Sequence, residues 1–340
     1  MSNTFLPSEY PIVAAPMAGG ATTVELAAAA GAAGAFPFLA AGYKTPDALH
    51  DEIFALRTGT SDFGVNLFVP GRPRVNRESF AGYARAITDE FRAYGLNPNP
   101  DPVDDDDAWG EKLALLREDP VAVVSLTFGL PPASEIALLK RAGSIVMATV
   151  TSPAEAREAE AAGVDALVVQ GPGAGGHSAT WDPDRRIADG STADSLGAAA
   201  AASRLPLVAA GGVEAAADVQ DLLANGAEAV AVGTLLLLTD EAGTSETHRR
   251  ALASGEFDET VVTRVFTGRP ARALRNGFVE RHAHEEITAY PAVHHLTREL
   301  RKRAGAAGDQ DRLHLWAGTG YRKARTEPVA QAIARLAEGL

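Results

Sequence analysis

The chain has no cysteine, and this absence removes several kinds of chemistry at once. Without thiols there is no disulfide framework, no thiolate nucleophile and no cysteine-ligated metal. A reducing compartment suits such a chain, so we expect a cytoplasmic protein. Basic residues are also in deficit, because 31 lysines and arginines face 44 aspartates and glutamates, which leaves a formal net charge of −13. This balance argues against nucleic acid or an anionic membrane as a partner.

Long hydrophobic runs are missing as well. The weakly apolar stretch at residues 26–42 consists mainly of alanine and glycine and contains Pro37, so it is too feebly hydrophobic to span a bilayer. The first residues, 1–13, show no basic region followed by an apolar core, so no signal peptide is expected. The composition that remains, 46% apolar and 22% charged, is typical of a globular protein.

Short apolar runs alternate with helical windows through most of the chain. There are eight of these runs, at residues 12–17, 35–40, 63–68, 122–129, 144–150, 166–171, 206–212 and 229–238. Between them lie windows with helix-start signals, such as residues 152–163, where Ser152 is a candidate cap, Pro153 takes the first helical position and Glu155 completes a capping box. The chain therefore reads as repeated strand and helix units.

The apolar runs do not alternate with polar residues, which is typical of a parallel sheet covered on both faces. Eight such units predict a closed (β/α)8 barrel, the TIM-barrel fold. A doubly wound open sheet would show the same order of elements. We favour the barrel because glycine or polar residues recur at the carboxyl end of nearly every strand, as a ring of loops around one mouth requires.

Two segments exceed what a bare barrel needs. Residues 93–111 interrupt the third crossover with three prolines and the run Asp104–Asp107. We interpret this segment as a solvated loop; a Ca²⁺ site is the weaker alternative, because the run lacks the glycine turn of a calcium loop. The residues after the eighth strand predict a mainly helical C-terminal lobe. We therefore divide the chain into a barrel domain, residues 1–240, and residues 241–340, which supply a barrel-closing helix and a lobe over the mouth.

The chemistry of such a barrel lies at the carboxyl ends of its strands, so the sequence itself offers candidate site residues. These positions hold Pro16, Met17, Asn66, Thr127, Thr149, Gln170, Gly211, Gly212, Gly233 and Thr234. Glycines after the last two strands let backbone N–H groups approach a phosphate. The amides of Asn66 and Gln170 each offer a donor and an acceptor, which suits the edge of an isoalloxazine or a nucleobase. The pattern predicts a flat ligand with a phosphate tail.

His177 follows the sixth strand in a loop that contains Gly171, Gly173, Gly175 and Gly176. The glycines allow this loop to wrap closely around a ligand, and an imidazole there can act as acid, base or hydrogen-bond donor. Four other histidines lie in the polar C-terminal region without a metal-binding spacing, and we assign them to a solvated surface: His282, His284, His294 and His295. No metal site is expected.

The motifs resemble, nearly end to end, those of the nitronate monooxygenases of the bacterial class I type, formerly called 2-nitropropane dioxygenases. The matching segments are residues 11–34, 39–49, 63–70, 146–177, 206–213, 229–238, 265–276 and 313–324. This resemblance implies non-covalently bound FMN and the oxidation of alkyl nitronates by O₂, with neutral nitroalkanes as further substrates. It departs from the family at Gly173, where a glutamate is usual, and at residues 178–181, which replace a basic residue and a glycine.

The resemblance also implies roles for individual residues. Pro16 and Met17 would lie beneath the flavin, and Asn66 and Gln170 would bind the flavin or its ribityl chain. Gly175 would approach the phosphate, and Gly176 would also contact the cofactor. The residues that would hold the phosphate are Gly211, Gly212, Ala231, Val232, Gly233 and Thr234. His177 matches the catalytic histidine, which removes the α-proton of a nitroalkane or donates a hydrogen bond to the nitronate oxygens.

Two alternatives stay open at this stage: an NAD(P)H-dependent flavin enoyl carrier-protein reductase with the same barrel, and a barrel that binds a phosphate ligand without redox chemistry. Thiolate chemistry like that of inosine-monophosphate dehydrogenase is excluded. Lys44, Tyr290, Tyr321 and Lys323 are interpreted as surface residues rather than a substrate gate. Arg269, Arg272 and Asn276 are expected to brace the lobe against the barrel. A monomer or homodimer is expected.

Overall fold

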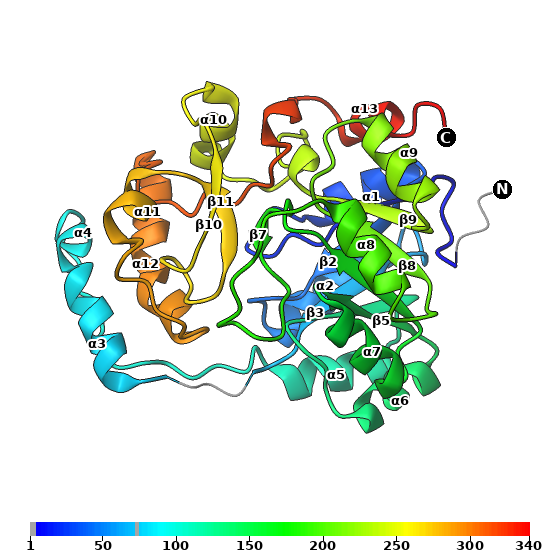
Figure 1. The fold of residues 1–340 in the computed structure, drawn as a ribbon, viewed down its shortest axis with the longest axis horizontal. Helices are drawn as coiled ribbons and strands as arrows, with labels where there is room; N and C mark the ends of the chain where they lie inside the picture. The colour runs from blue at the N-terminus through cyan, green and yellow to red at the C-terminus, as the bar shows by residue number, and fades with distance from the viewer. Residues whose placement is uncertain (1–4, 72–74) are drawn as a thin grey trace.

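Eight parallel strands form a closed barrel in the computed structural model, which describes residues 5–71 and 75–340. Around the barrel they are β1 (Ile12–Ala14), β2 (Phe36–Ala40), β3 (Gly64–Phe68), β4 (Val123–Thr127), β5 (Ile145–Val150), β6 (Ala166–Gln170), β8 (Leu207–Ala210) and β9 (Ala229–Val232) (Figure 1). β9 pairs with β1 and closes the ring. Each predicted run contains one strand, so the predicted (β/α)8 barrel is confirmed. Residues 1–4, which belong to the N-terminal segment where no signal peptide is expected, lie outside the described residues.

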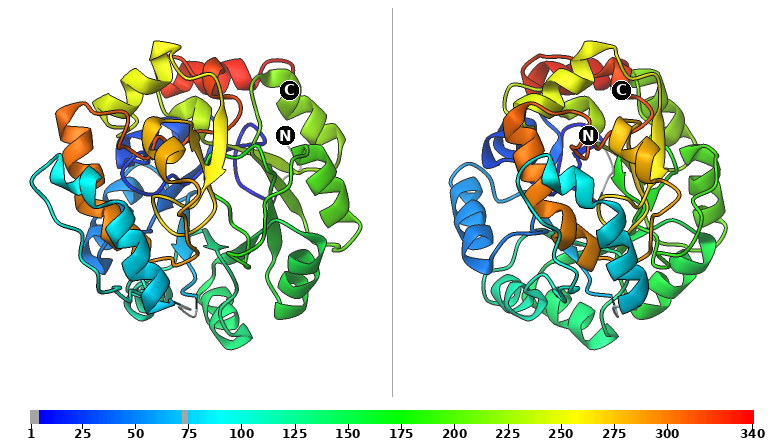
Figure 2. Two further views of the ribbon diagram at one scale, coloured as in Figure 1. Left: turned by 60° about the vertical axis from the view of Figure 1, so that its left-hand side comes forward. Right: turned by 90° about the vertical axis from the view of Figure 1, so that its left-hand side faces the viewer.

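Helices cover the outside of the barrel. They are α1 (Val24–Ala32), α2 (Pro46–Arg57), α5 (Trp109–Glu118), α6 (Ala133–Ala142), α7 (Pro153–Ala162), α8 (Thr192–Ala200), α9 (Ala216–Ala224) and α13 (Val329–Leu336). Figure 2 shows them as a ring around the strands. α13 packs against α1, so the last helix of the chain completes the ring beside the first.

The apolar strands bury side chains on both faces of the sheet. Inside the barrel, Val13, Phe38, Met147 and Val208 belong to one buried cluster. A larger cluster fills the space between the outer face of the strands and the helices, and Leu39 of β2 is one of its members. A strand buried on both faces needs apolar residues throughout, which explains the continuous runs in the sequence.

The start of α7 shows how the local sequence sets a helix boundary. Ser152 accepts a hydrogen bond from the N–H of Glu155 (3.2 Å), and Pro153 occupies the first turn, as predicted. The predicted capping box is wrong. The Glu155 carboxylate instead accepts hydrogen bonds from the N–H groups of Thr151 (2.6 Å) and Trp181 (3.0 Å). These bonds connect the loop after β6 to this helix.

A lobe with its own apolar core lies across one end of the barrel. Its elements are α10 (Glu246–Ser254), β10 (Thr260–Thr263), β11 (Ala271–Leu274), α11 (Gly277–His282), α12 (Ala292–Ala307) and, from the third crossover, α3 (Arg77–Ala86) and α4 (Thr88–Arg92). Phe80 and Phe91 of the crossover pack with Phe266, Phe278 and Leu300 in one buried cluster. Figures 1 and 2 show α3 and α12 side by side. A boundary at residue 240 stays a prediction, but it leaves out α3 and α4, which share the core of the lobe.

A small sheet in the lobe was not predicted from the sequence. β10 and β11 form an antiparallel pair, and β7 (Gly176–His177), from the loop after β6, is the third strand. Ala271 of β11 lies opposite His177 in this pairing. The sheet therefore ties the histidine loop of the barrel to the lobe.

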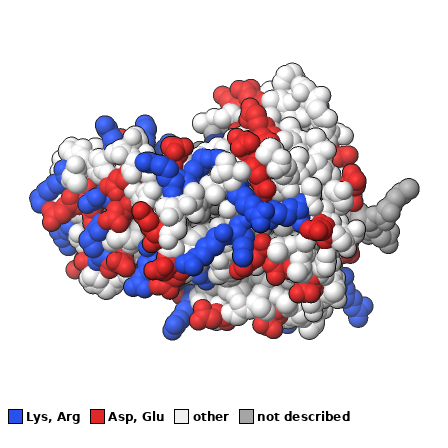
Figure 3. All heavy atoms as spheres, turned by 90° about the horizontal axis from the view of Figure 1, so that it is seen from above, with Lys and Arg blue, Asp and Glu red and all other residues white. Residues whose placement is uncertain are grey.

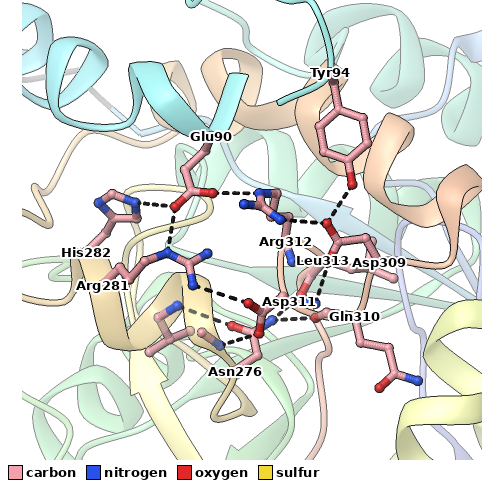
Figure 4. Close-up of polar contacts among 12 residues, drawn as sticks. Glu90, Tyr94, Asn276, Arg281, His282, Asp309, Gln310, Asp311, Arg312 and Leu313 are labelled. Atoms are coloured by element: carbon pink, nitrogen blue, oxygen red, sulfur yellow. Dashed lines mark hydrogen bonds and ion pairs between the residues drawn. The ribbon is translucent and has the colours of Figure 1, made fainter. Parts of the chain in front are cut away.

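Glu90 on α4 fastens the crossover helices to the rest of the lobe (Figure 4). Its buried carboxylate accepts hydrogen bonds from Nε of Arg281 (2.7 Å), Nε2 of His282 (3.0 Å) and Nε of Arg312 (2.6 Å). Burial by itself would raise the pKa of Glu90, but the hydrogen bonds from Arg281 and His282 hold it below its usual value. His282 was predicted to lie on the surface, and this prediction is wrong, because the residue is buried. Its two ring nitrogens contact carboxylates, Nε2 that of Glu90 and Nδ1 that of Glu285 (2.8 Å), and these contacts compensate the burial.

The net negative charge is not gathered into one patch on the face seen from above in Figure 3. Acidic and basic side chains are interspersed there, and Lys and Arg form a band across the middle of the view. The net negative charge is therefore not concentrated on this face of the molecule.

Candidate active site

A cavity of about 1090 Å³ lies between the mouth of the barrel and the lobe. The structure brings all the predicted site residues to its wall: Pro16, Met17, Asn66, Gln170, Gly175, Gly176, His177, Gly211, Gly212, Ala231, Val232, Gly233 and Thr234. Thr127 and Thr149 also line it. This volume reaches the upper end of the range for small-molecule sites, about 300–1,000 Å³, so it can hold a cofactor and a small substrate together.

One end of the cavity presents free backbone donors. Within the described residues, the N–H groups of Gly212, Gly233 and Thr234 have no acceptor in the protein. They lie where β8 and β9 end, and Gly211 and Gly212 adopt φ angles of +100° and +74° that favour glycine. Unpaired amides at such a position form a site for an anionic oxygen cluster.

The glycines at this end also let three backbone segments meet. A Cβ on Gly211 would approach Ala174 N to 2.7 Å, and a Cβ on Gly175 would approach Gly318 N to 2.4 Å. Gly318 in turn donates to the Thr234 hydroxyl (2.9 Å). Residues 316–320 therefore complete this end of the cavity, a role that the sequence analysis did not assign to them. The sequence did carry a signal for this segment, because two glycines, Gly318 and Gly320, follow closely after the aromatic Trp316.

The departure from the family at Gly173 has a steric explanation. A Cβ at this position would lie 2.9 Å from Oγ1 of Thr319 and 3.0 Å from Cα of Gly212. The N–H of Thr319 also donates to the Gly173 carbonyl (3.0 Å). A glutamate therefore does not fit at residue 173 unless the C-terminal segment moves.

The amide side chains of Asn66 and Gln170 use part of their hydrogen-bonding capacity within the protein. Asn66 Nδ2 donates to the hydroxyls of Ser125 (2.8 Å) and Thr127 (2.9 Å). Gln170 Nε2 donates to the His177 carbonyl (3.2 Å), and its Oε1 accepts from the N–H of Ala179 (2.8 Å). Gln170 therefore holds the histidine loop in place at the cavity wall.

His177 is held in a mostly neutral and aromatic environment. Its Nε2 lies 2.9 Å from the Thr267 hydroxyl, and the rings of Phe128, Tyr290 and Trp316 surround it. Removal from bulk water, followed by the charges of Arg269 and Arg301, lowers the pKa of His177 to about 3. The imidazole is therefore neutral at physiological pH.

The wall beside His177 contains aromatic residues that sequence reasoning missed. Tyr43 follows β2 and Phe128 follows β4, both with positive φ angles, 68° and 81°. The Tyr290 hydroxyl donates to that of Tyr43 (3.3 Å), and the His294 ring stacks on Tyr43 with centroids 4.1 Å apart. Tyr43 and Phe128 sit at strand ends, so the rule that found Asn66 could have found them.

Several surface predictions are corrected here. Lys44 lines the cavity and pairs with Glu52 (2.5 Å), and Tyr321 is buried, whereas Lys323 is exposed as predicted. Tyr290 is half-buried against His177. These positions could not be assigned because their neighbours come from distant segments.

The predicted solvated histidines divide into two groups. His294 is buried and lines the cavity, and Nε2 of His295 donates to the Asp105 carboxylate (2.8 Å) at the cavity edge. Only His284 of the four is fully exposed, its side chain at 75%. The surface prediction failed for His294 and His295 because one face of α12 lines the cavity. The polar residues of this helix lie on that face as well as on the face exposed to solvent.

The acidic run is only partly a solvated loop. Asp104, Asp105 and Asp106 are exposed as predicted. Asp107 instead turns inward, where it pairs with the buried Lys112 (2.8 Å) and accepts from the N–H of Tyr43 (2.8 Å). The run therefore supports the aromatic wall.

The predicted bracing residues contact the histidine loop and the C-terminal segment. Arg269 donates to the carbonyls of Ser178 and Thr180 and stacks on Phe128, with 3.9 Å from Cζ to the ring centroid. Arg272 donates to the Pro172 carbonyl (2.9 Å). Asn276 Nδ2 donates to the carbonyls of Gln310 and Leu313, both at 2.8 Å. These contacts connect the lobe with the mouth of the barrel.

Two further findings bear on the kind of site. Among residues 5–71 and 75–340, no helix combines the length and apolarity that a bilayer span requires. The same residues contain no group of three or more His, Asp or Glu side chains arranged to hold a metal ion.

Comparison with known proteins gives a consistent result. The family model described as nitronate monooxygenase matches residues 3–339. A probable nitronate monooxygenase of Staphylococcus aureus strain MSSA476 is 33% identical over 332 residues, which cover 96% of this chain and 93% of the relative. The solved structure of a nitroalkane oxidase from Streptomyces ansochromogenes is similar with a TM-score of 0.91 and 43% identity, covering 97% of this chain and 96% of that one. FabK from Thermotoga maritima gives a TM-score of 0.74 at 26% identity, covering 98% and 93%.

Proposed function

The chain belongs to the nitronate monooxygenase family, and from this premise we propose that it oxidises alkyl nitronates with FMN and O₂, releasing carbonyl compounds and nitrite. The observation that carries the proposal is the cavity, which joins unpaired backbone amides at one end to a neutral histidine among aromatic rings at the other. The first end suits a phosphate, and the second suits a small organic substrate.

The residues at the mouth fit FMN. The amides of Gly212, Gly233 and Thr234 would bind the phosphate, with Gly175 and Gly211 leaving room for the backbone to approach it. Pro16 and Met17 would support one face of the ring, and Asn66 and Gln170 would lie at its edge. Bound FMN supplies the electron transfer to O₂, and the protein supplies position and electrostatics.

His177 would act on the substrate in two ways. A nitronate is already an anion and needs only a hydrogen bond to its oxygens, whereas a neutral nitroalkane must first lose its α-proton. When the Thr267 hydroxyl donates to Nε2 of His177, the neutral ring carries its hydrogen on Nδ1 and can donate to a nitronate oxygen. When the hydroxyl instead donates to the Arg269 carbonyl (3.4 Å), it accepts from Nε2–H of His177 and leaves Nδ1 free to take the α-proton of a nitroalkane. The histidine is then the general base for nitroalkanes only.

The proposal is tested by measuring O₂ uptake and nitrite release with propyl-2-nitronate and with 2-nitropropane. We expect both products with the nitronate. His177→Asn should retain FMN but lose about 100-fold or more in turnover of 2-nitropropane, the size of a general-base contribution. The matched control is His284→Asn, which changes an exposed ring and should behave as the unsubstituted protein. Flavin-loaded protein that releases no nitrite from the nitronate would contradict the proposal.

A further inference from the structure

Arg301 on α12 is a buried cation that has no acidic partner among residues 5–71 and 75–340. Its side chain lies at the cavity wall, and the residue is 6% exposed. Nε donates to the Thr297 hydroxyl (3.0 Å), and Nη2 donates to the His294 carbonyl (2.9 Å) and to Nδ1 of His294 (3.3 Å). Every acceptor is neutral. Burial lowers the pKa of Arg301 to about 10, so the guanidinium is still charged at neutral pH. An unpaired buried charge is costly, and it calls for a functional reason.

The neighbouring charges do not neutralise this end of the cavity. Arg269 is a second buried cation, 5% exposed, whose hydrogen bonds go to backbone carbonyls. Asp107 faces the same region but pairs with Lys112, and Asp105 pairs with His295. His177 and His294 are neutral, since burial is the largest cause that lowers the pKa of each. The walls beside Tyr43 therefore carry excess positive charge.

Arg301 also fixes the proton of His294. A guanidinium only donates, so Nδ1 of His294 must accept and cannot carry a hydrogen. The neutral ring then carries its hydrogen on Nε2. The stacking of this ring on Tyr43, with an interplanar angle of 6°, holds it in one orientation. Arg301 thus provides a charge and a positioned neutral donor at the same place.

We propose that Arg301 makes the end of the cavity beside Tyr43 and His177 selective for anions over neutral molecules of the same shape. This inference rests on the proposed function for its substrate class: a nitronate would be preferred to its parent nitroalkane because only the nitronate carries the charge. Arg301 is then a specificity-determining residue that acts directly through its charge and indirectly through His294.

The test measures binding, without turnover, by isothermal titration calorimetry of the holoenzyme. The probes are sodium nitrate, a small planar anion, and 2-methyl-2-nitropropane, a neutral nitro compound that has no α-proton and so cannot be turned over by the proposed reaction. The variants are Arg301→Met, which removes the charge, and Arg301→Lys, which keeps it. The matched control is Arg303→Met, which removes the same charge from an exposed position on the same helix, where it pairs with Glu299.

We expect Arg301→Met to weaken nitrate binding by at least about 10-fold and 2-methyl-2-nitropropane binding by less than about twofold, because only the anion interacts with the charge. Arg301→Lys should recover most of the nitrate affinity, and Arg303→Met should change neither. The thermal midpoint of Arg301→Met should be unchanged or raised, because an uncompensated buried charge is removed.

Three results would overturn the inference: nitrate affinity unchanged in Arg301→Met, equal losses for both probes, or no preference for nitrate in the unsubstituted protein. The outcome is separate from that of the proposed function. A protein that binds nitrate with this dependence on Arg301 but releases no nitrite from nitronate would refute only the proposed reaction.

Discussion

His177 lies among three aromatic rings and near two buried arginines, and these surroundings decide when it carries a proton. Its pKa of about 3 is far below the ordinary value, so the folded protein keeps the ring neutral as the pH falls through about 6.5. The ring is protonated, and loses its ability to act as a base, only in much more acidic solution.

The pH dependence of nitronate turnover follows from this. With a preformed nitronate, kcat/KM should show no inflection near pH 6.5, because the free enzyme has no functional histidine that titrates there. The measurement is the initial rate of nitrite release across about pH 5.5 to 8, with the nitronate added from alkaline stock. An inflection near pH 6.5 that disappears in His177→Asn would show that the histidine is exposed to bulk water, against this account.

Some residues of the site could be predicted from the sequence and others could not. Asn66, Gln170 and the glycines after β8 and β9 were found because a barrel places strand ends around one mouth, a rule that needs no contacts. Arg301 and His294 could not be found in this way. Their burial depends on α12 lying against the cavity, and nothing local in a polar helix shows which face is covered.

Among the elements of the site, the histidine loop and the C-terminal segment pack closely against each other at Gly175. Gly175→Ala should force Ala317 and Gly318 to move, because the new Cβ would lie 2.4 Å from Gly318 N. We expect a loss of about 1–3 kcal/mol in the free energy of unfolding, typical of overpacking, and reduced FMN content. Denaturant unfolding and the absorbance of bound flavin measure these two quantities.

The matched control for this substitution is Gly197→Ala in α8, where a Cβ would meet nothing within 4 Å. It should leave flavin content unchanged and stabilise the protein by up to about 1 kcal/mol, since alanine is the better helix former. If Gly175→Ala behaves like this control, the contact between the two segments is not tight.

The elements themselves were largely predictable, for a physical reason. Buried parallel strands must be apolar on both faces, so all eight appear in the sequence as continuous runs. β7 could not be predicted, because it has only two residues and exists through pairing with β11, about 95 residues later in the chain. The membership of α3 and α4 in the lobe depends likewise on contacts with α11 and α12.

At the scale of the whole molecule, Glu90 connects the crossover helices to the C-terminal part of the lobe. Glu90→Gln leaves Arg281, His282 and Arg312 without their shared carboxylate. We expect a loss of about 1–3 kcal/mol, less than for a fully buried pair because both arginines are partly exposed. Thermal unfolding and limited proteolysis between α4 and α5 should both report the loosened lobe.

Glu280→Gln is the control for this prediction, because it removes an acidic charge from the same lobe at a position where the side chain is 58% exposed. It should change the thermal midpoint little. Equal effects of the two substitutions would mean that the network around Glu90 contributes no more than an exposed ion pair.

We propose that the barrel mouth holds FMN next to a cavity that accepts a nitronate. This proposal is tested most directly by mixing the purified protein with propyl-2-nitronate without O₂ and recording the flavin absorbance, with NADH and NADPH added to separate samples. We expect a yellow protein whose absorbance is bleached rapidly by the nitronate and barely by either nucleotide. Rapid bleaching by a pyridine nucleotide alone would support the alternative reductase, and a colourless protein that releases no flavin on heating would contradict the claim.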